Sequence, residues 1–228
     1  MTQPFTREDV CRARPQILHE GRFGNARVLL FRRNGENWVV KDFGPKPALV
    51  RLTLGRYFLR RELAAMRRLQ GVPGVPQNAF RVDQNAVAYR HLPGRVLRRI
   101  PRDQLSPDYF PALERLVMQM HAKGVAHLDL RYRHNVLVLD DGTPGLIDFQ
   151  TFVCLDGFPG WLQRHFKQMD LGGVYKHWRK RASATLDPAK SALLNKQNAL
   201  RRFWILRGYG GLARKWTRLR QARRARAA

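Results

Sequence analysis

The stretch from Ala126 to Asn135 reads AHLDLRYRHN, and the stretch from Ile147 to Gln150 reads IDFQ. Together they place a carboxylate (Asp129), a carboxamide (Asn135) and a second carboxylate (Asp148) around one predicted β-hairpin. Phosphoryl transfer from a metal-bound nucleotide uses such a set, because one carboxylate faces the attacking hydroxyl while the other two groups hold the metal. These residue types in this order therefore predict a phosphotransfer site.

The two stretches resemble the catalytic loop (H-R-D-L-x-x-x-N) and the metal-binding turn (D-F-G) of the protein-kinase-like superfamily. The chain departs from that pattern at three positions. Asn135 lies one residue further from Asp129, Gln150 replaces the glycine, and Leu128 replaces the arginine that many members carry. A wider loop absorbs the extra residue provided that both side chains still converge. The alternative is a buried histidine–aspartate hydrogen bond beside an ordinary hairpin.

A cationic group for the phosphates is found upstream. Residues 38–43 read as a strand with Lys41 inside it, which resembles the V-A-I-K strand of the same superfamily. The dipeptide at Asn34 and Gly35 lies between two β-rich runs and predicts a tight hairpin turn. This order resembles the hairpin that covers the nucleotide in the amino-terminal lobe of kinases.

The loop before that hairpin resembles a glycine-rich phosphate loop in degraded form. Gly21 matches the first glycine, Phe23 replaces the second, Ala26 replaces the third, and Val28 matches the valine at the end of the loop. Gly24 lets the backbone approach a phosphate closely. Taken alone, the segment fits an ordinary hairpin turn at least as well.

The next predicted element is a helix around residues 60–70. Apolar residues recur at helical spacing and give one buried stripe, on which Glu62 also lies. A carboxylate on a buried face needs a partner, and the resemblance implies that this partner is Lys41. No basic residue lies three or four positions from Glu62, so pairing within the helix is a weak alternative, and a solvated carboxylate at the edge of the stripe is the other.

Two further strands (residues 79–83 and 86–90) and a helix over residues 108–123 complete the path to the catalytic loop. By its order in the chain, the stretch from Arg90 to Leu92 resembles the hinge between the two kinase lobes. We expect its backbone groups to hold the adenine ring.

The resemblance implies a role for each site residue. Asp129 accepts or orients the proton of the substrate hydroxyl, and Arg131 offsets charge on the transferred group. Lys41 steadies the phosphates of ATP, while Asn135 and Asp148 hold Mg²⁺ through oxygen atoms.

The sequence after Asp148 indicates which subclass of the protein-kinase-like superfamily the chain resembles. No A-P-E-like motif follows, so the activation segment and docking platform of typical protein kinases are not expected. Residues 169–180 resemble the Asp-Leu helix of the lipopolysaccharide core sugar kinases, the Kdo and heptose kinases of Gram-negative bacteria. In that family Asp170 would support the catalytic loop, whereas the alternative is an acid favoured by the dipole at a helix amino terminus. RIO-type kinases, other compact serine/threonine protein kinases, and a kinase-like binding protein without turnover remain alternatives.

Composition indicates an anionic partner. The formal net charge is +26 and the sequence pI is about 11.5, and no acidic residue follows Asp187. Apolar residues such as Trp204, Trp216 and Leu219 alternate with basic ones towards the end of the chain. This pattern suits a helix in a membrane interface, and we expect an anionic glycolipid substrate together with peripheral membrane contact. Nucleic-acid binding is the competing interpretation, and a cationic aminoglycoside substrate fits the positive charge poorly.

These observations predict an α+β, bilobal protein-kinase-like fold with a β-rich amino-terminal lobe and a shortened, mainly helical carboxy-terminal lobe. We expect lobes at about residues 15–91 and 92–182, within a kinase-like domain of residues 1–182, and a basic helical extension over residues 183–228. Cys11 and Cys154 suggest no disulfide framework, and neither a secretory signal nor a membrane-spanning run is visible. The expected location is the cytoplasm, on the cytoplasmic face of the inner membrane.

Overall fold

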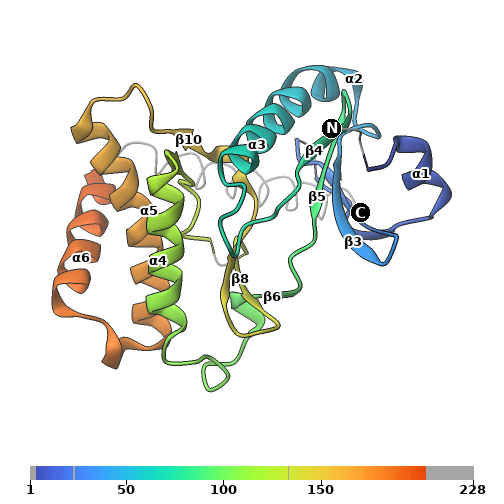
Figure 1. The fold of residues 1–228 in the computed structure, drawn as a ribbon. Helices are drawn as coiled ribbons and strands as arrows, with labels where there is room; N and C mark the ends of the chain where they lie inside the picture. The colour runs from blue at the N-terminus through green and yellow to red at the C-terminus, as the bar shows by residue number, and fades with distance from the viewer. Residues whose placement is uncertain (1–3, 23, 133, 204–228) are drawn as a thin grey trace, which may run out of the picture. The chain divides into compact units, whose positions relative to one another are not determined.

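The computed structural model describes residues 4–22, 24–132 and 134–203 of the 228-residue chain. The chain divides into two compact units, Met1–Thr185 and Leu186–Ala228. The first contains a β-sheet lobe followed by a mainly helical lobe (Figure 1), and the second contains helix α6 (Pro188–Phe203). The predicted α+β class and its division into lobes are confirmed. Among the described residues, no helix combines the length and the apolar character needed to cross a bilayer.

Five antiparallel strands form the sheet of the amino-terminal lobe, in the order β1-β2-β3-β5-β4. Asn34 and Gly35 have φ angles of 51° and 77°, so the predicted tight turn joins β2 to β3. The strands are β1 (Gln16–His19), β2 (Arg27–Arg33), β3 (Glu36–Asp42), β4 (Phe80–Asp83) and β5 (Ala86–Arg90).

The two faces of this sheet bury different partners because side chains alternate along each strand. On one face Trp38 and Val40 pack with Phe5 from the chain's first residues. On the other face Phe43 and Val87 pack against the predicted helix, which spans Arg56–Arg68 and is labelled α3 in Figure 1. The same alternation turns Lys41, two residues before Phe43, towards α3.

A short helix that sequence analysis did not predict covers the outer face of the sheet. Helix α1 (Arg7–Arg12) begins with a capping box, in which the Thr6 backbone N–H donates to the Asp9 carboxylate and the Thr6 hydroxyl accepts from the Asp9 N–H. The T-x-x-D spacing was the missed signal. Arg7 then ties this helix to the sheet through ion pairs with Asp42 and Asp83.

Helix α3 is preceded by two other helical turns, α2 (Ala48–Val50) and the π-helix η1 (Arg51–Gly55). Gly55 lies against the ring of Phe43, and a Cβ atom added there would approach the ring to 2.8 Å. Only glycine therefore allows this close contact between the helical run and the sheet.

The carboxy-terminal lobe is built on two helices, α4 (Tyr109–Ala122) and α5 (Gly160–Arg181). The ring of Phe110 on α4 stacks on that of Trp178 on α5, with 5.7 Å between the ring centres. Helix α5 begins nine residues earlier than the stretch that carried the family resemblance, which places Asp170 inside the helix and excludes the alternative of a helix-terminal acid. The remaining elements are β6 (Gly94–Val96), η2 (Leu97–Arg99), β7 (Val125–Ala126), β8 (Val136–Leu139), β9 (Pro144–Leu146), η3 (Phe149–Thr151), β10 (Val153–Cys154) and η4 (Ser183–Thr185).

Candidate active site

Lys41 lies between two carboxylates. Its ammonium group donates to Glu62 Oε1 at 2.6 Å and to Asp148 Oδ1 at 2.8 Å. The side chains of Lys41 and Glu62 are 7% and 0% exposed, so this ion pair is shielded from water. The predicted pairing of Lys41 with Glu62 is therefore present, and the D-F-Q turn joins the same cluster through Asp148.

Burial and charge act against each other within this cluster. Burial alone would lower the pKa of Lys41, but the Glu62 and Asp148 carboxylates outweigh it and hold that pKa above its ordinary value. Burial would likewise raise the pKa of Asp148, but the Lys41 ammonium outweighs it and holds the pKa of Asp148 below its ordinary value. Burial does raise the pKa of Glu62, against the opposing effect of Lys41. Lys41 therefore stays cationic beside an ionised Asp148.

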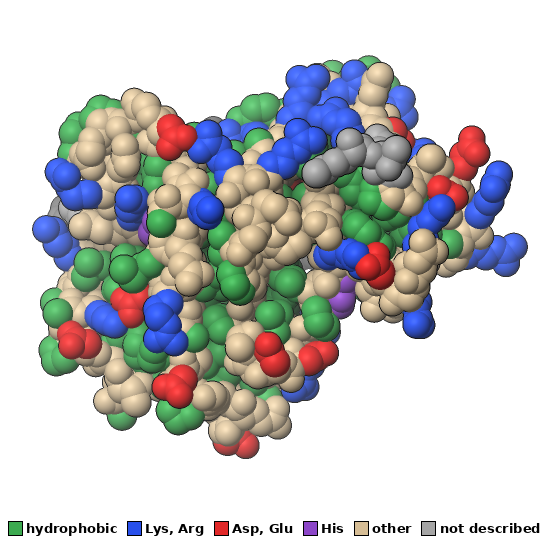
Figure 2. All heavy atoms as spheres, viewed as in Figure 1, with side chains coloured by type: hydrophobic (Ala, Val, Ile, Leu, Met, Phe, Trp, Pro, Cys, Tyr) green, Lys and Arg blue, Asp and Glu red, His purple; other side chains and the backbone are tan. Residues whose placement is uncertain are grey.

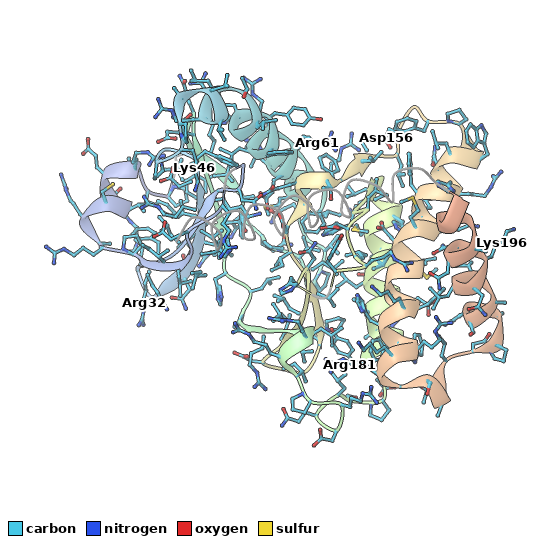
Figure 3. The ribbon with its side chains drawn as sticks, turned by 180° about the vertical axis from the view of Figure 1, so that it is seen from behind. Arg32, Lys46, Arg61, Asp156, Arg181 and Lys196 are labelled. Atoms are coloured by element: carbon cyan, nitrogen blue, oxygen red, sulfur yellow. The ribbon has the colours of Figure 1, made fainter. Side chains whose placement is uncertain are left out.

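Two arginines tie α3 to the segment that follows Asp148. Arg61 donates to the Gln150 carbonyl at 3.2 Å and to the Phe152 carbonyl, and its guanidinium lies 5.0 Å from the centre of the Phe152 ring. Seven residues later, Arg68 binds Asp156 at 2.5 Å. Figure 3 shows Arg61 on α3 and Asp156 just beyond β10. These contacts fix α3, and with it Glu62, relative to the turn that carries Asp148.

Asp129 and Asn135 converge despite the additional residue between them. The Asn135 amide nitrogen donates to Asp129 Oδ2 at 2.8 Å and to the Asp129 carbonyl at 3.2 Å. The loop is therefore wide enough to absorb the insertion. Burial raises the pKa of Asp129, and the hydrogen bond from Asn135 opposes that rise. Asp129 is thus a partly desolvated carboxylate held in one orientation by an amide.

Asp170 holds the start of the catalytic loop from within α5. Its carboxylate accepts from the backbone N–H groups of His127 and Leu128 at 2.8 and 2.7 Å and lies 3.0 Å from His121 Nε2. Leu128 has a φ angle of 64°, a left-handed conformation that is costly for a bulky residue other than glycine. The contact of its N–H with Asp170 stabilises that conformation. This support, which the family resemblance implied, is present.

Close packing brings α5 against the same loop. A Cβ atom added at Gly173 would lie 2.9 Å from the Leu130 carbonyl carbon and 3.0 Å from the Arg131 nitrogen. His177 Nε2 lies 2.8 Å from the Leu130 carbonyl, and Lys176 donates to the Arg131 carbonyl at 3.2 Å. The backbone at Arg131 is therefore held by α5, and the Arg131 side chain is half-buried.

His127 links the two motifs. Its Nε2 atom lies 3.0 Å from the Ile147 carbonyl, its ring packs 4.7 Å from that of Phe149, and its own carbonyl accepts from the Thr151 hydroxyl at 3.0 Å. The His127 ring bonds a backbone carbonyl, so the alternative of a hydrogen bond between this ring and Asp129 is wrong. His127 therefore connects the loop that carries Asp129 to the turn that carries Asp148.

The candidate phosphate loop is a compact turn. Gly21 has a φ angle of 68°, and a Cβ atom there would lie 2.3 Å from the Ala26 carbonyl oxygen, so the turn requires glycine. Ala26 itself is buried among the residues between the sheet and α3, while Gly24 and Val28 are half-buried. Phe23 lies outside the described residues.

The candidate hinge follows β5. The Arg90 side chain pairs with Glu36 and lies 4.5 Å above the ring of Trp38, so it anchors the end of the strand to β3. Leu92 is half-buried, and Gly94 two residues later begins β6. The stretch from Arg90 to Leu92 thus connects the five-stranded sheet to β6, and its role as a hinge that holds adenine stays a prediction.

The available oxygen donors fit a magnesium ion that arrives with a nucleotide. Asn135 uses its amide nitrogen for Asp129, which leaves its oxygen, and Asp148 uses Oδ1 for Lys41, which leaves Oδ2. Within the described ranges, no group of three or more His, Cys, Asp or Glu residues could hold a metal by itself. Mg²⁺ is commonly bound by one or two protein oxygens together with phosphates and water.

Two solved structures have a fold similar to that of this chain. The Rio2 kinase from Chaetomium thermophilum gives a TM-score of 0.57 at 17% sequence identity, over 82% of this chain and 65% of that chain. The Rio2 kinase–ADP/Mg²⁺–phosphoaspartate complex from the same organism gives a TM-score of 0.53 at 16% identity, over 86% and 70%. The chain has a protein-kinase-like fold. It spans 65% of the length of the first of these kinases. No protein-family model and no curated protein matches the sequence.

Several residues that shape this candidate site were not found from the sequence. His121 sits under Asp170, and Arg61 reaches the carbonyls after the D-F-Q turn. Tyr89 on β5 is buried beside the Lys41 cluster, and this burial raises the pKa of its phenol. The spacing of Arg61 and Arg68, two helical turns apart on one face, was an available signal. The contacts of His121 and Tyr89 depend on the packing of distant elements.

Proposed function

We propose that this protein is an ATP-dependent phosphotransferase that uses Mg²⁺ and an alcohol acceptor. One observation carries the proposal: the Lys41 ammonium group is shared between Glu62 and Asp148, while Asn135 orients Asp129 in the same site. A protein that only binds partners gains nothing from burying these charges together. A kinase of the same fold is described in complex with ADP and Mg²⁺, which supports this choice of nucleotide and metal.

Each residue then has a defined task. Bound Mg²⁺–ATP supplies the phosphoryl group and neutralises charge on its oxygens. Lys41 orients phosphate oxygens, and Glu62 keeps its ammonium group in place. Asp129 accepts or orients the proton of the acceptor hydroxyl, a role that suits a partly desolvated carboxylate.

Three further residues complete these assignments. Asn135 and Asp148 hold the metal through their remaining oxygens, and Arg131 offsets charge on the transferred group. The loop before β2, with Gly21 and Gly24, and the backbone between Arg90 and Leu92 border the nucleotide.

The acceptor that we propose is a hydroxyl group of a lipopolysaccharide core sugar. The chain has only short elements between the D-F-Q turn and α5, which leaves little protein to dock a polypeptide. A net charge of +26 suits a phosphorylated glycolipid at an anionic membrane surface. The corresponding location is the cytoplasmic face of the inner membrane. The basic residues 204–228, on which the membrane prediction first rested, lie outside the described residues.

A RIO-like protein kinase is the second candidate, because two solved structures with a similar fold are Rio2 kinases. Its acceptor would be a serine or threonine hydroxyl, and the same site residues would serve it. The basic residues of the chain would then bind the phosphate backbone of an RNA–protein substrate rather than a membrane.

Phosphate transfer from labelled ATP tests these alternatives directly. The wild-type chain is given Mg²⁺ and, in parallel, lipopolysaccharide core, a generic protein substrate and a protein–RNA complex. Label on the glycolipid supports the sugar kinase, whereas label on protein alone moves the assignment to the RIO-like kinase. Binding of ATP without transfer to any acceptor would identify a kinase-like binding protein instead.

A further inference from the structure

The helical run that leads into α3 carries an exposed apolar patch. Leu49 is 77% exposed, Leu52 49%, Leu54 48% and Tyr57 54%. A single exposed leucine needs no explanation, but a contiguous group of this kind marks a contact with another apolar phase. We name these four residues, with Lys46, Arg51, Arg56, Arg60 and Arg61 around them, the α2–α3 surface.

The backbone maintains this exposure. Arg51–Gly55 form a π-helix, a rare conformation that recurs at functional sites. Because a π-turn holds more residues than an α-turn, it shifts the helical phase between α2 and α3. Leu59 and Leu63 after the π-helix are buried on the sheet, whereas Leu52 and Leu54 inside it remain exposed.

All the charged residues of the α2–α3 surface are basic. Residues 43–61 include five basic residues and no acidic one. Lys46, Arg51 and Arg56 donate to neutral oxygens, namely the Glu20 and Gly21 carbonyls, the Gly44 carbonyl and the Gln84 side chain. In the part of the chain that the structure describes, none of the five basic residues forms an ion pair with a carboxylate. Figure 2 shows blue side chains gathered over α2 and α3 with hydrophobic green among them.

We propose that the α2–α3 surface docks on an anionic lipid bilayer. Exposed leucines and a tyrosine insert at the boundary between headgroups and acyl chains, while the surrounding basic side chains meet anionic headgroups. Each basic side chain adds attraction to such a surface, and here no carboxylate reduces it.

The positive charge and the exposed leucines of the α2–α3 surface disfavour partners other than an anionic bilayer. The chain after Asp187 offers no acidic side chain that could attract the α2–α3 surface, since its charged residues are all basic. A second copy with a formal net charge of +26 is repelled in the same way. A nucleic acid would satisfy the arginines but would leave the leucines in water.

The α2–α3 surface borders the candidate phosphate loop. The Lys46 ammonium group donates to the Glu20 and Gly21 carbonyls at 3.0 and 2.9 Å, and the Leu54 side chain lies 4.0 Å from a Cβ position at Gly24. Figure 3 shows Lys46 on the amino-terminal lobe. Docking here brings the site to a membrane-borne acceptor, a consequence that rests on the proposed function. Membrane binding itself requires no kinase activity.

Sedimentation of the full chain with vesicles tests the proposal. Vesicles of phosphatidylethanolamine with phosphatidylglycerol are compared with vesicles of phosphatidylcholine alone. The double variant Leu49→Gln/Leu52→Gln should bind the anionic vesicles about tenfold more weakly than wild type. The control variant Met118→Gln removes a 57% exposed side chain on α4 and should bind normally. Equal binding by all three proteins would overturn the proposal.

A charge-matched pair separates this surface from general basicity. Arg51→Gln/Arg60→Gln and Arg32→Gln/Arg98→Gln each remove two positive charges from the chain, and the second pair lies on exposed positions elsewhere. Only the first pair should weaken vesicle binding several-fold. Equal losses of vesicle binding in the two double variants would contradict the assignment of the α2–α3 surface as the membrane contact. So would an Arg51→Gln/Arg60→Gln variant whose RNA binding is weakened as much as its vesicle binding.

Hydrogen exchange locates the contact. Peptides covering residues 48–57 should exchange more slowly on anionic vesicles, and unchanged exchange there would mean that another part of the chain binds. Magnesium–ATP binding is measured on the same leucine variant and should equal that of wild type. A failure of ATP binding in every protein would count against the proposed kinase and leave the membrane result standing.

Discussion

Two carboxylates hold the site, Asp170 and Asp148, and they differ in their exposure and in what they bind. The Asp170 side chain is 0% exposed and is used entirely for the backbone of the catalytic loop and for His121. The Asp148 side chain is 42% exposed and binds the ammonium group of the Lys41 side chain. The first fixes a backbone conformation and has no other partner to take. The second has a free oxygen, and a metal cation can replace the Lys41 ammonium group as its partner.

This difference separates a rigid half of the site from an exchangeable half. The Asp129–Asn135 pair belongs to the rigid half, since its loop is held by Asp170 and by α5. Lys41 belongs to the exchangeable half, where Glu62 retains it while Asp148 is available for a metal. The predictions below test whether the two halves behave in these ways.

The largest effect is expected at Asp129. Asp129→Asn keeps the shape of the side chain but removes its ability to accept a proton, so phosphate transfer should fall by about 10²–10⁴-fold. ATP affinity should stay near the wild-type value. Asp140→Asn, a change at an exposed carboxylate beyond β8, is the control and should transfer normally. Normal turnover by Asp129→Asn would remove this residue from the chemistry.

The next largest effect should distinguish Asp170 from Asp148 in stability. Asp170→Ala leaves two buried N–H groups without a partner and should lower the free energy of unfolding by about 3–5 kcal/mol. Asp148→Ala should cost much less, because its side chain is partly solvated and Glu62 still pairs with Lys41. Urea denaturation monitored by circular dichroism measures both values. If both variants lost the same free energy of unfolding, the proposed difference between Asp170 and Asp148 would be wrong.

A smaller effect is expected at Arg61, which positions Glu62 without touching the nucleotide. Arg61→Ala removes two hydrogen bonds between α3 and the segment after Asp148, and should weaken ATP binding about three- to tenfold. Arg60→Ala, at the exposed neighbouring position on α3, is the matched control. The same affinity in both variants would show that the tether does not set the position of Glu62. Arg61→Lys should restore only part of the loss, because lysine cannot reach both carbonyls in the same way.

The smallest effect concerns the titration of Asp129. Burial raises its pKa and the Asn135 amide opposes that rise, so Asn135→Ala should raise the pKa of Asp129 further. In wild type, the deprotonated form that the chemistry needs is lost as pH falls through a value above that of an ordinary aspartate. Carbon-13 NMR of the carboxyl groups in the ligand-free protein measures both titrations. A lower pKa in the variant would contradict the role given to this hydrogen bond.

Much of this site could be predicted from the sequence because its residues follow local patterns. The Asn34–Gly35 turn, the lysine-bearing strand and the helical stripe that includes Glu62 each depend on short-range spacing. Glu62 was informative because its helix offered it no cation, and the structure supplies Lys41 from a distant strand.

The parts that were missed depend on contacts between distant elements. Nothing local shows that His121 lies under Asp170 or that Arg61 meets the carbonyls of Gln150 and Phe152. The width of the loop before Asn135 could not be deduced either, because it depends on how α5 packs against Leu130. The exposure of the leucines of the α2–α3 surface could not be deduced from their spacing either, because it depends on the π-helix that precedes α3.

Calorimetric titration of ATP with and without Mg²⁺ tests the exchangeable half of the site most directly. We predict that Mg²⁺ strengthens ATP binding to the wild-type protein, since Asp148 and Asn135 each retain an oxygen for the metal. The gain should disappear in Asp148→Asn, while metal-free ATP binding through Lys41 persists. If wild type binds ATP equally well without Mg²⁺, or does not bind ATP at all, these residues do not form a nucleotide–metal site.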